Sequence, residues 1–177
     1  IRRWAYATSK ALDEFMTLAY YHEKKLPAII VRFFNTVGPG QLGDYGMVIP
    51  IFVNKALAND PIPIFGDGNQ KRSFTHVDDA ARAIIQLMGT DKALGEVFNV
   101  GNENEITIKE LADLVIDKCN SKSLIEYIPY EKAYGHGFED MKRRKPNLDK
   151  IKKLIDFKPK IELDQTIDEV IDYQKSA

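Results

Sequence analysis

Tyr6 and Lys10 have the side chains and the spacing that acid/base catalysis could use. They lie four residues apart in Tyr6-Ala7-Thr8-Ser9-Lys10, so on a helix they share one face, one turn apart. A phenol with its ordinary pKa of about 10 is too weakly ionised to act as a base at neutral pH. A nearby ammonium group favours the phenolate, which makes the pair a candidate general acid/base. By itself the spacing also fits a Tyr packed at a helix start and a solvated Lys.

Asn35 and Arg72 could bind an anionic or sugar ligand. Asn35 follows an apolar run, and ligands of open α/β sheets bind at the carboxyl ends of strands. The alternative for Asn35 is an Asx turn. Arg72 follows a predicted tight turn, and its guanidinium group suits a diphosphate, although a solvated surface Arg is the default. The basic run Lys142-Arg143-Arg144-Lys145 has the same two interpretations.

Helices and strands must hold these side chains, and the apolar pattern predicts both. Leu12, Phe15, Met16 and Ala19 have helical spacing after Tyr6. Thr107 and Glu110 form a predicted capping box. The expected helices span residues 6–22, 48–58, 77–88, 107–119, 147–155 and 164–174, with Ile167, Val170 and Ile171 inward. The expected strands span 28–34, 62–65 (an edge strand, because of Pro63), 73–77, 96–100 and 124–128, and residues 129–146 are expected to form a long polar loop. Alternating strands and helices predict an α/β fold.

Composition narrows the possible classes. The chain has 177 residues, 44% hydrophobic and 29% charged, with a net charge of −1, so no bulk attraction to nucleic acid or membrane is expected. No apolar run reaches the length of a membrane span. Cys119 is the only cysteine, which rules out an internal disulfide and fits a reducing, cytoplasmic setting. The histidines at 22, 76 and 136 lack metal-ligand spacing, so no metal is expected, and we interpret His76 as structural.

Four later segments, read together with Tyr6 and Lys10, resemble a known family. They are Arg32-Phe33-Phe34-Asn35-Thr36-Val37-Gly38-Pro39, Ile62-Pro63-Ile64-Phe65-Gly66-Asp67-Gly68, Arg72-Ser73-Phe74-Thr75-His76-Val77-Asp78-Asp79-Ala80 and Phe98-Asn99-Val100-Gly101. In this order the chain resembles the C-terminal part of an extended short-chain dehydrogenase/reductase, and more narrowly the nucleotide-sugar epimerases, dehydratases and decarboxylases. The resemblance implies Rossmann-body segments near 1–46 and 67–102, and a substrate-binding lobe near 47–66 and 103–177.

The resemblance also implies roles for individual residues. Tyr6 and Lys10 would be catalytic and would contact the NAD cofactor, together with Phe33, Phe34 and Thr36. The substrate-binding residues would be Asn35, Val48, Ile49, Phe52, Pro63, Ile64, Phe65, Arg72 and Arg144. For Val48, Ile49 and Phe52, a place in the hydrophobic core is an equally good interpretation.

The activity implied by the resemblance is oxidation of a UDP-sugar at C4 by NAD, through a 4-keto intermediate. We expect a UDP-sugar 4-epimerase, with a UDP-glucuronate decarboxylase or a nucleotide-sugar 4,6-dehydratase as alternatives, and a non-catalytic sugar-nucleotide binding module as a distant third. Members of the family pack the Tyr-x-x-x-Lys helix in a dimer interface, so a homodimer is expected.

The glycine cluster at 38, 40, 43 and 46 is the nearest approach to a dinucleotide-binding turn. Such a turn opens a βαβ unit and places the pyrophosphate at a helix N-terminus. We interpret the spacing of these glycines as wrong for such a turn, and no βαβ unit is predicted after them, so we expect a loop. We therefore expect the NAD-binding half to precede this chain, and we expect the isolated chain to be inactive.

Overall fold

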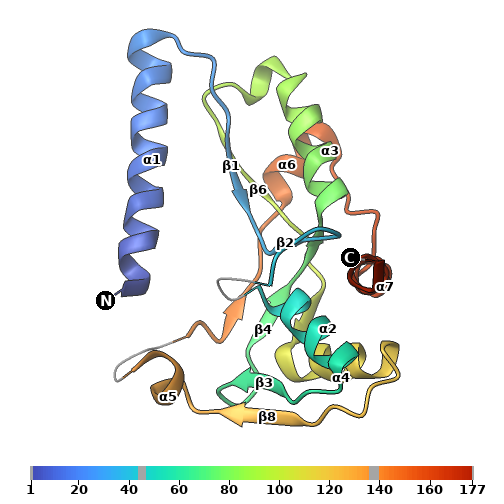
Figure 1. The fold of residues 1–177 in the computed structure, drawn as a ribbon. Helices are drawn as coiled ribbons and strands as arrows, with labels where there is room; N and C mark the ends of the chain where they lie inside the picture. Colours follow the sequence, from blue (N-terminus) through green and yellow to red (C-terminus); the bar gives the residue numbers. More distant parts are fainter. Residues whose placement is uncertain (1, 44–46, 136–139, 177) are drawn as a thin grey trace.

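The computed structural model describes residues 2–43, 47–135 and 140–176, and its alternating helices and parallel strands confirm the α/β class. The described residues form two hydrophobic cores, with one pair of parallel strands in the upper part and three small sheets around the lower core (Figure 1). Helix α7 (Leu163–Ser176) joins the lower core, whereas α6 (Asp149–Ile155) belongs to the upper core.

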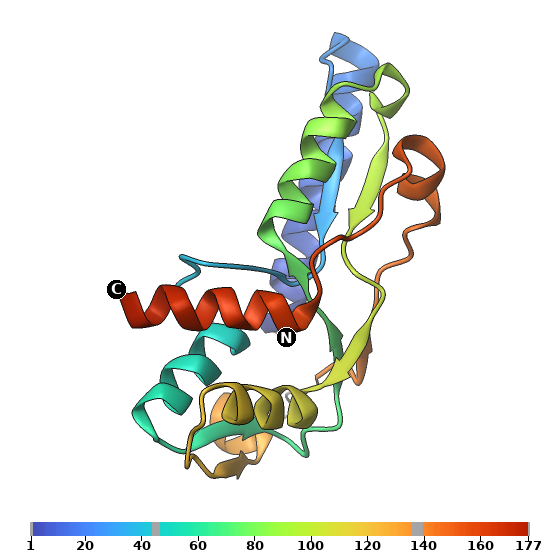
Figure 2. The same ribbon diagram turned by 90° about the vertical axis from the view of Figure 1, so that its right-hand side faces the viewer.

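The upper part is a layered arrangement around two strands. β1 (Ile30–Phe33) pairs in parallel with β6 (Val97–Val100), in a register that sets Ile30 opposite Val97. Helix α1 (Arg2–Lys24) lies on one side of this pair and α3 (Val77–Met88) on the other, as Figure 2 shows from a second direction. The core on the α3 side includes Ala83, Leu87, Phe98, Val100, Leu148, Ile151 and Phe157.

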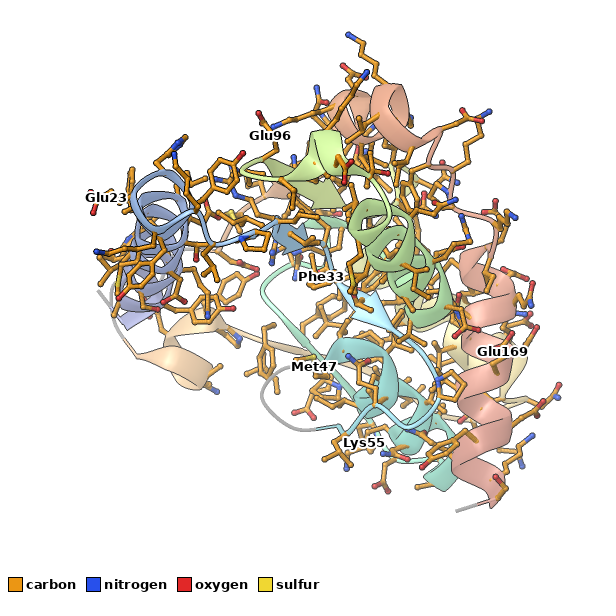
Figure 3. All side chains as sticks on the ribbon, turned by 90° about the horizontal axis from the view of Figure 1, so that it is seen from above. Glu23, Phe33, Met47, Lys55, Glu96 and Glu169 are labelled. Atoms are coloured by element: carbon orange, nitrogen blue, oxygen red, sulfur yellow. The ribbon has the colours of Figure 1, made fainter. Side chains whose placement is uncertain are left out.

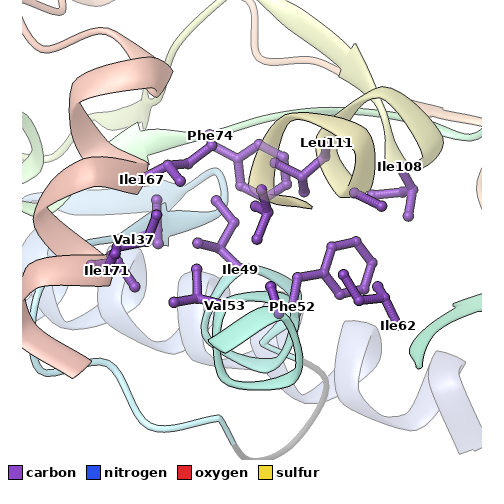
Figure 4. Packing of buried hydrophobic residues seen from close by; sticks show 14 of the residues in the cluster. Val37, Ile49, Phe52, Val53, Ile62, Phe74, Ile108, Leu111, Ile167 and Ile171 are labelled. Atoms are coloured by element: carbon purple, nitrogen blue, oxygen red, sulfur yellow. The ribbon is translucent and has the colours of Figure 1, made fainter. Parts of the chain in front are cut away.

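The lower core lies between α2 (Val48–Ala58), α4 (Ile108–Lys118) and α7, as Figure 4 shows. Its buried side chains include Val37, Ile49, Phe52, Val53, Ile62, Phe74, Leu111 and Ile167. The predicted inward residues of the last helix, Ile167, Val170 and Ile171, are all buried there, which confirms that prediction.

Small parallel and mixed sheets border this core. β3 (Ile62–Phe65) pairs only with β8 (Ile125–Ile128) in the described part of the chain, so the predicted edge position of the Pro63 strand is confirmed. β4 (Lys71–Ser73) lies between β7 (Glu105–Thr107) and β9 (Arg143–Arg144). β2 (Thr36–Val37) pairs with β5 (Thr75–His76).

Local signals account for the helix starts. The side chain of Thr107 accepts a hydrogen bond from the Glu110 amide, and the Glu110 carboxylate accepts one from the Thr107 amide, so the predicted capping box opens α4. The ring of His76 accepts a hydrogen bond from the Asp78 amide at the start of α3. The bounds predicted for α2 and α3 are confirmed to the residue.

The prediction of one long loop over residues 129–146 is wrong. This stretch contains α5 (Tyr130–Tyr134), a short 5-residue helix, and strand β9. β9 pairs with β4 in parallel, and a strand of two residues depends on such a partner rather than on its own sequence. The 3-10 helix η1 (Asp91–Ala93) and β7 were likewise not predicted.

The glycine cluster does not build a dinucleotide turn. Gly38, Gly40 and Gly43 do have the spacing G-x-G-x-x-G. The strand before them, β2, and the strand after α2, β3, lie in different sheets, so they form no βαβ unit. The interpretation of residues 38–43 as a loop agrees with this topology, whereas residues 44–46 lie outside the described part.

Helices long and apolar enough to cross a membrane are not found among the described residues.

Candidate active site

Helix α1 carries Tyr6 and Lys10 on one exposed face. Tyr6 is 69% exposed, and the Lys10 Nζ lies 2.9 Å from an Asp13 carboxylate oxygen. The hydrogen bond and charge of Asp13 raise the pKa of Lys10, and the charge of an ionised Tyr6 acts in the same direction. The predicted helix is therefore observed, with Tyr6 and Lys10 one turn apart on it, whereas the Asp13 partner of Lys10 was not foreseen.

Two contacts hold α1 against the β1–β6 pair. The Arg32 guanidinium group makes two hydrogen bonds, of 2.6 and 2.5 Å, to the Glu14 carboxylate. The ring of Tyr21 lies so close to Gly95 that any Cβ there would collide with it. The N-terminal end of α1 lies on the side toward which β1 runs (Figure 1), and α/β sheets bind ligands at the carboxyl ends of their strands.

Arg72 and Arg144 lie side by side in one sheet. β4 and β9 are parallel, and their register pairs Arg72 directly with Arg144. Paired residues of adjacent strands project to the same face of a sheet. Two residues that lie 72 positions apart in the sequence thus place their cationic side chains on one face.

Phe34 and Asn35 join this group at the end of β1. The Arg144 guanidinium carbon lies 5.3 Å from the centroid of the Phe34 ring, a cation–π contact. The Asn35 side-chain amide donates to the Ser73 carbonyl oxygen at 2.7 Å, and its backbone has a left-handed φ of 43°. Asn35 is thereby fixed beside the strand that carries Arg72.

Arg72 is largely enclosed, with a side chain 13% exposed. Its Nη1 donates to the backbone oxygens of Lys71 and Met141, each at 2.8 Å. Its Nη2 lies 2.7 Å from the Asp140 carboxylate. The alternative of a solvated surface Arg therefore does not describe Arg72 in this structure.

Sequence reasoning missed Asp140 and Tyr130, which complete the surroundings of Arg72. The Tyr130 hydroxyl donates to the same Asp140 oxygen at 3.3 Å. Burial, followed by the charge of Asp140, raises the pKa of Tyr130 to about 12. Asp140 is 68 residues from Arg72, so no local spacing signals the contact; the only available hint was a carboxylate next to the basic run.

The residues predicted to lie beside the nicotinamide are partly accessible. Phe33 is exposed and lies near the centre of the molecule when viewed from above, with α1 and its Glu23 to one side (Figure 3). The Thr36 hydroxyl is buried and has no hydrogen-bond partner among the described residues. Because an unsatisfied buried hydroxyl needs a partner, Phe33 and Thr36 fit the nicotinamide end of a dinucleotide. No turn in the described part of the chain fits the pyrophosphate of that dinucleotide.

The remaining predicted substrate contacts lie around the lower core. Ile49 and Phe52 are buried in it and Val48 packs against it, so the core interpretation describes these three. In β3, Ile64 is also buried, while Pro63 and Phe65 are partly exposed. The Gln70 side chain donates to the Phe65 carbonyl oxygen at 2.9 Å. This hydrogen bond connects the end of β3 to the segment that immediately precedes Arg72.

His76 has the structural position expected of it. It is buried, and its Nε2 lies 3.0 Å from the Glu169 carboxylate of α7. His22 lies in the last turn of α1, and His136 lies outside the described residues. Within the described ranges, no group of three His, Cys, Asp or Glu side chains is arranged to hold a metal ion.

A model of the NAD dependent epimerase/dehydratase family matches residues 2–101, a segment that includes Tyr6, Lys10, Asn35 and Arg72. A UDP-N-acetyl-alpha-D-glucosaminuronate decarboxylase of Bacillus cytotoxicus is 41% identical over 172 residues, which are 97% of this chain and 53% of that protein.

Solved structures show the same similarity. A dTDP-glucose 4,6-dehydratase of Bacillus anthracis, crystallised with NAD, is 31% identical with a TM-score of 0.84, over 97% of this chain and 52% of that one. A UDP-glucose 4-epimerase of Thermotoga maritima, crystallised with UDP-glucose, is 26% identical with a TM-score of 0.87, over 97% and 53%. The chain spans about half the length of these relatives. It belongs to the NAD dependent epimerase/dehydratase family.

Proposed function

We propose that the protein carrying this chain oxidises a UDP-sugar at C4 with NAD, and that Tyr6 is its acid/base residue. The observation that carries the proposal is the Tyr6–Lys10 pair on one exposed face of α1, inside the segment matched by the NAD dependent family. Bound NAD would supply the hydride acceptor. The site residues of this chain would bind the sugar nucleotide and move the proton.

Each group in the site has a distinct task. Tyr6 takes the proton from the C4 hydroxyl of the sugar, and the Lys10 ammonium lies one helical turn away on the same face of α1. Asp13 forms a hydrogen bond with Lys10 and raises the pKa of that ammonium, which is the protonated form at neutral pH. Arg72 and Arg144 face a diphosphate together, since guanidinium groups bind phosphate oxygens through paired N–H donors. Asn35, Pro63 and Phe65 border the nucleotide-sugar.

The fate of the 4-keto sugar separates two candidate activities. The relative that is 41% identical decarboxylates UDP-N-acetyl-alpha-D-glucosaminuronate, which favours a sugar carrying a C5 carboxylate and loss of CO₂ once C4 is a ketone. The structural similarity to a UDP-glucose 4-epimerase favours simple inversion at C4. We place decarboxylation first on the higher identity. From the sequence we expected a 4-epimerase, with decarboxylation as an alternative.

Tyr6→Phe in the whole protein tests the common chemistry. It should lower kcat at least about 100-fold, the usual scale for losing a general acid/base, while NAD binding by calorimetry stays unchanged. Tyr20→Phe is the matched control, because Tyr20 is also an exposed Tyr on α1. It should leave both kcat and NAD binding unchanged. Near-normal turnover in Tyr6→Phe would reject the assignment.

Mass spectrometry of the product assigns the reaction. UDP-N-acetylglucosaminuronate should lose 44 mass units as CO₂ if decarboxylation is correct. A product of unchanged mass with an inverted C4 would instead establish the epimerase.

A further inference from the structure

The Asp140 carboxylate contacts neighbouring groups of the protein, including the arginine that we assign to a diphosphate. One oxygen accepts from the Met141 amide at 2.8 Å. The other accepts from Arg72 Nη2 at 2.7 Å and from the Tyr130 hydroxyl at 3.3 Å. The Asp140 side chain is 19% exposed. Its negative charge is therefore directed at Arg72 rather than left facing an incoming anion.

Tyr130 is fixed in turn by the end of β3. Gly66, with φ of 80°, lies against the Tyr130 ring so closely that a side chain there would collide with it. Burial raises the pKa of Tyr130 to about 12, and its protonated hydroxyl donates to the Asp140 carboxylate. A chain of contacts thus runs from Gly66 through Tyr130 and Asp140 to Arg72.

Resting on the function proposed above, we infer that Asp140 and Tyr130 are positioning residues that hold the Arg72 guanidinium group ready for the diphosphate of the substrate. Three contacts fix the group before any ligand arrives: two backbone oxygens on Nη1 and Asp140 on Nη2. A flexible arginine would lose rotamer freedom on binding, and a pre-ordered one loses less. Asp140 therefore strengthens diphosphate binding without contacting the ligand.

The test is Asp140→Asn in the whole protein, with UDP as the probe in calorimetry and uridine as a second probe in competition. Asn keeps the shape and one acceptor but removes the charge. We expect UDP affinity to fall by about 10- to 100-fold, the range typical of residues that orient a ligand-binding group. Uridine affinity should not change, because uridine has no diphosphate. A loss of folded structure would weaken both probes.

Three further variants complete the experiment. Glu105→Gln is the matched control, because Glu105 holds Arg143 by hydrogen bonds of 2.7 and 2.6 Å in the same sheet, and it should leave UDP affinity unchanged. Tyr130→Phe removes only the hydroxyl and should weaken UDP binding by about 2- to 10-fold, the scale of one hydrogen bond of typical strength. This variant decides the question if Asp140→Asn does not fold. Arg72→Ala should weaken UDP at least about 30-fold.

The outcomes separate this inference from the proposed function. If Arg72→Ala weakens UDP while Asp140→Asn and Tyr130→Phe do not, the positioning role is overturned and the function stands. If Asp140→Asn weakens UDP and uridine equally, Asp140 only supports the fold, and the inference again fails. If Arg72→Ala leaves UDP affinity unchanged, Arg72 has no part in diphosphate binding, and both are rejected.

Discussion

Helices α1 and α2 both carry an apolar face, but only α2 has that face covered within the described part of the chain. Phe52 of α2 is 2% exposed and packs among residues of α4 and α7. Phe15 of α1 is 72% exposed, and Leu12 and Met16 beside it are also exposed. An apolar periodicity in the sequence predicts that one face of a helix is buried. It does not predict whether the surface that covers this face belongs to the same chain. The following variants of the 177-residue chain test the difference between the covered face of α2 and the exposed face of α1.

Phe52→Ala should have the largest effect, because it opens a cavity in the lower core. The expected loss in the free energy of unfolding is about 3–5 kcal/mol, measured by urea denaturation. Phe15→Ala is the matched control and should change that free energy by less than about 0.5 kcal/mol, as an exposed residue does. A cost for Phe15→Ala comparable to that for Phe52→Ala would mean that α1 is packed in solution. In the whole protein, a covered α1 face would produce such a cost.

Thr107→Ala should have an intermediate effect. The Thr107 hydroxyl caps α4 by accepting from the Glu110 amide at 3.1 Å, and loss of such a cap costs about 1 kcal/mol. In α1 the Thr17 hydroxyl bonds back to the Asp13 carbonyl at 2.7 Å, so Thr17→Ala should be neutral or slightly stabilising. Thermal denaturation of the two variants gives the comparison, and a larger loss for Thr17→Ala would contradict it.

Glu14→Gln should have the smallest effect, because the Glu14–Arg32 pair that attaches α1 is partly exposed. We expect a loss of about 0.2–1 kcal/mol at pH 7. The hydrogen bond to Arg32 is the main cause that lowers the pKa of Glu14 in the folded chain. A lowered carboxyl pKa stabilises the fold above the unfolded value of about 4.3 and ceases to do so as the pH falls through the folded value. The difference between wild type and variant should therefore shrink below about pH 4, and a difference independent of pH would exclude the charge as its origin.

The helices whose ends depend on local sequence signals were predicted correctly. The apolar spacing in residues 48–58 and the Asp pair at the start of α3 were sufficient to fix both helices to the residue. α5, β7 and β9 were missed for a common reason. They are short, and β7 and β9 exist because β4 lies between them, so their formation depends on tertiary pairing rather than on propensity.

The same limit applies to the candidate site. The residue types and the resemblance identified Tyr6, Lys10, Asn35, Arg72 and Arg144, and the structure brings Arg72, Arg144, Phe34 and Asn35 into one group. The contact of the Asp140 carboxylate with Arg72 could not be predicted, because it spans 68 residues. The roles assigned to all these residues stay predictions until the variants are measured.

The path of the chain between its two cores restricts how the molecule can be divided. Ile29 and Val31 lie against the upper core, α2 and β3 against the lower, α3 and β6 against the upper, α4 against the lower, α6 against the upper and α7 against the lower. The lower core draws on residues from Val37 to Ile171 and the upper core on residues from Ile29 to Phe157, so the two overlap along most of the described chain. Cleavage or recombination at any single site between Val37 and Phe157 would therefore divide both cores at once.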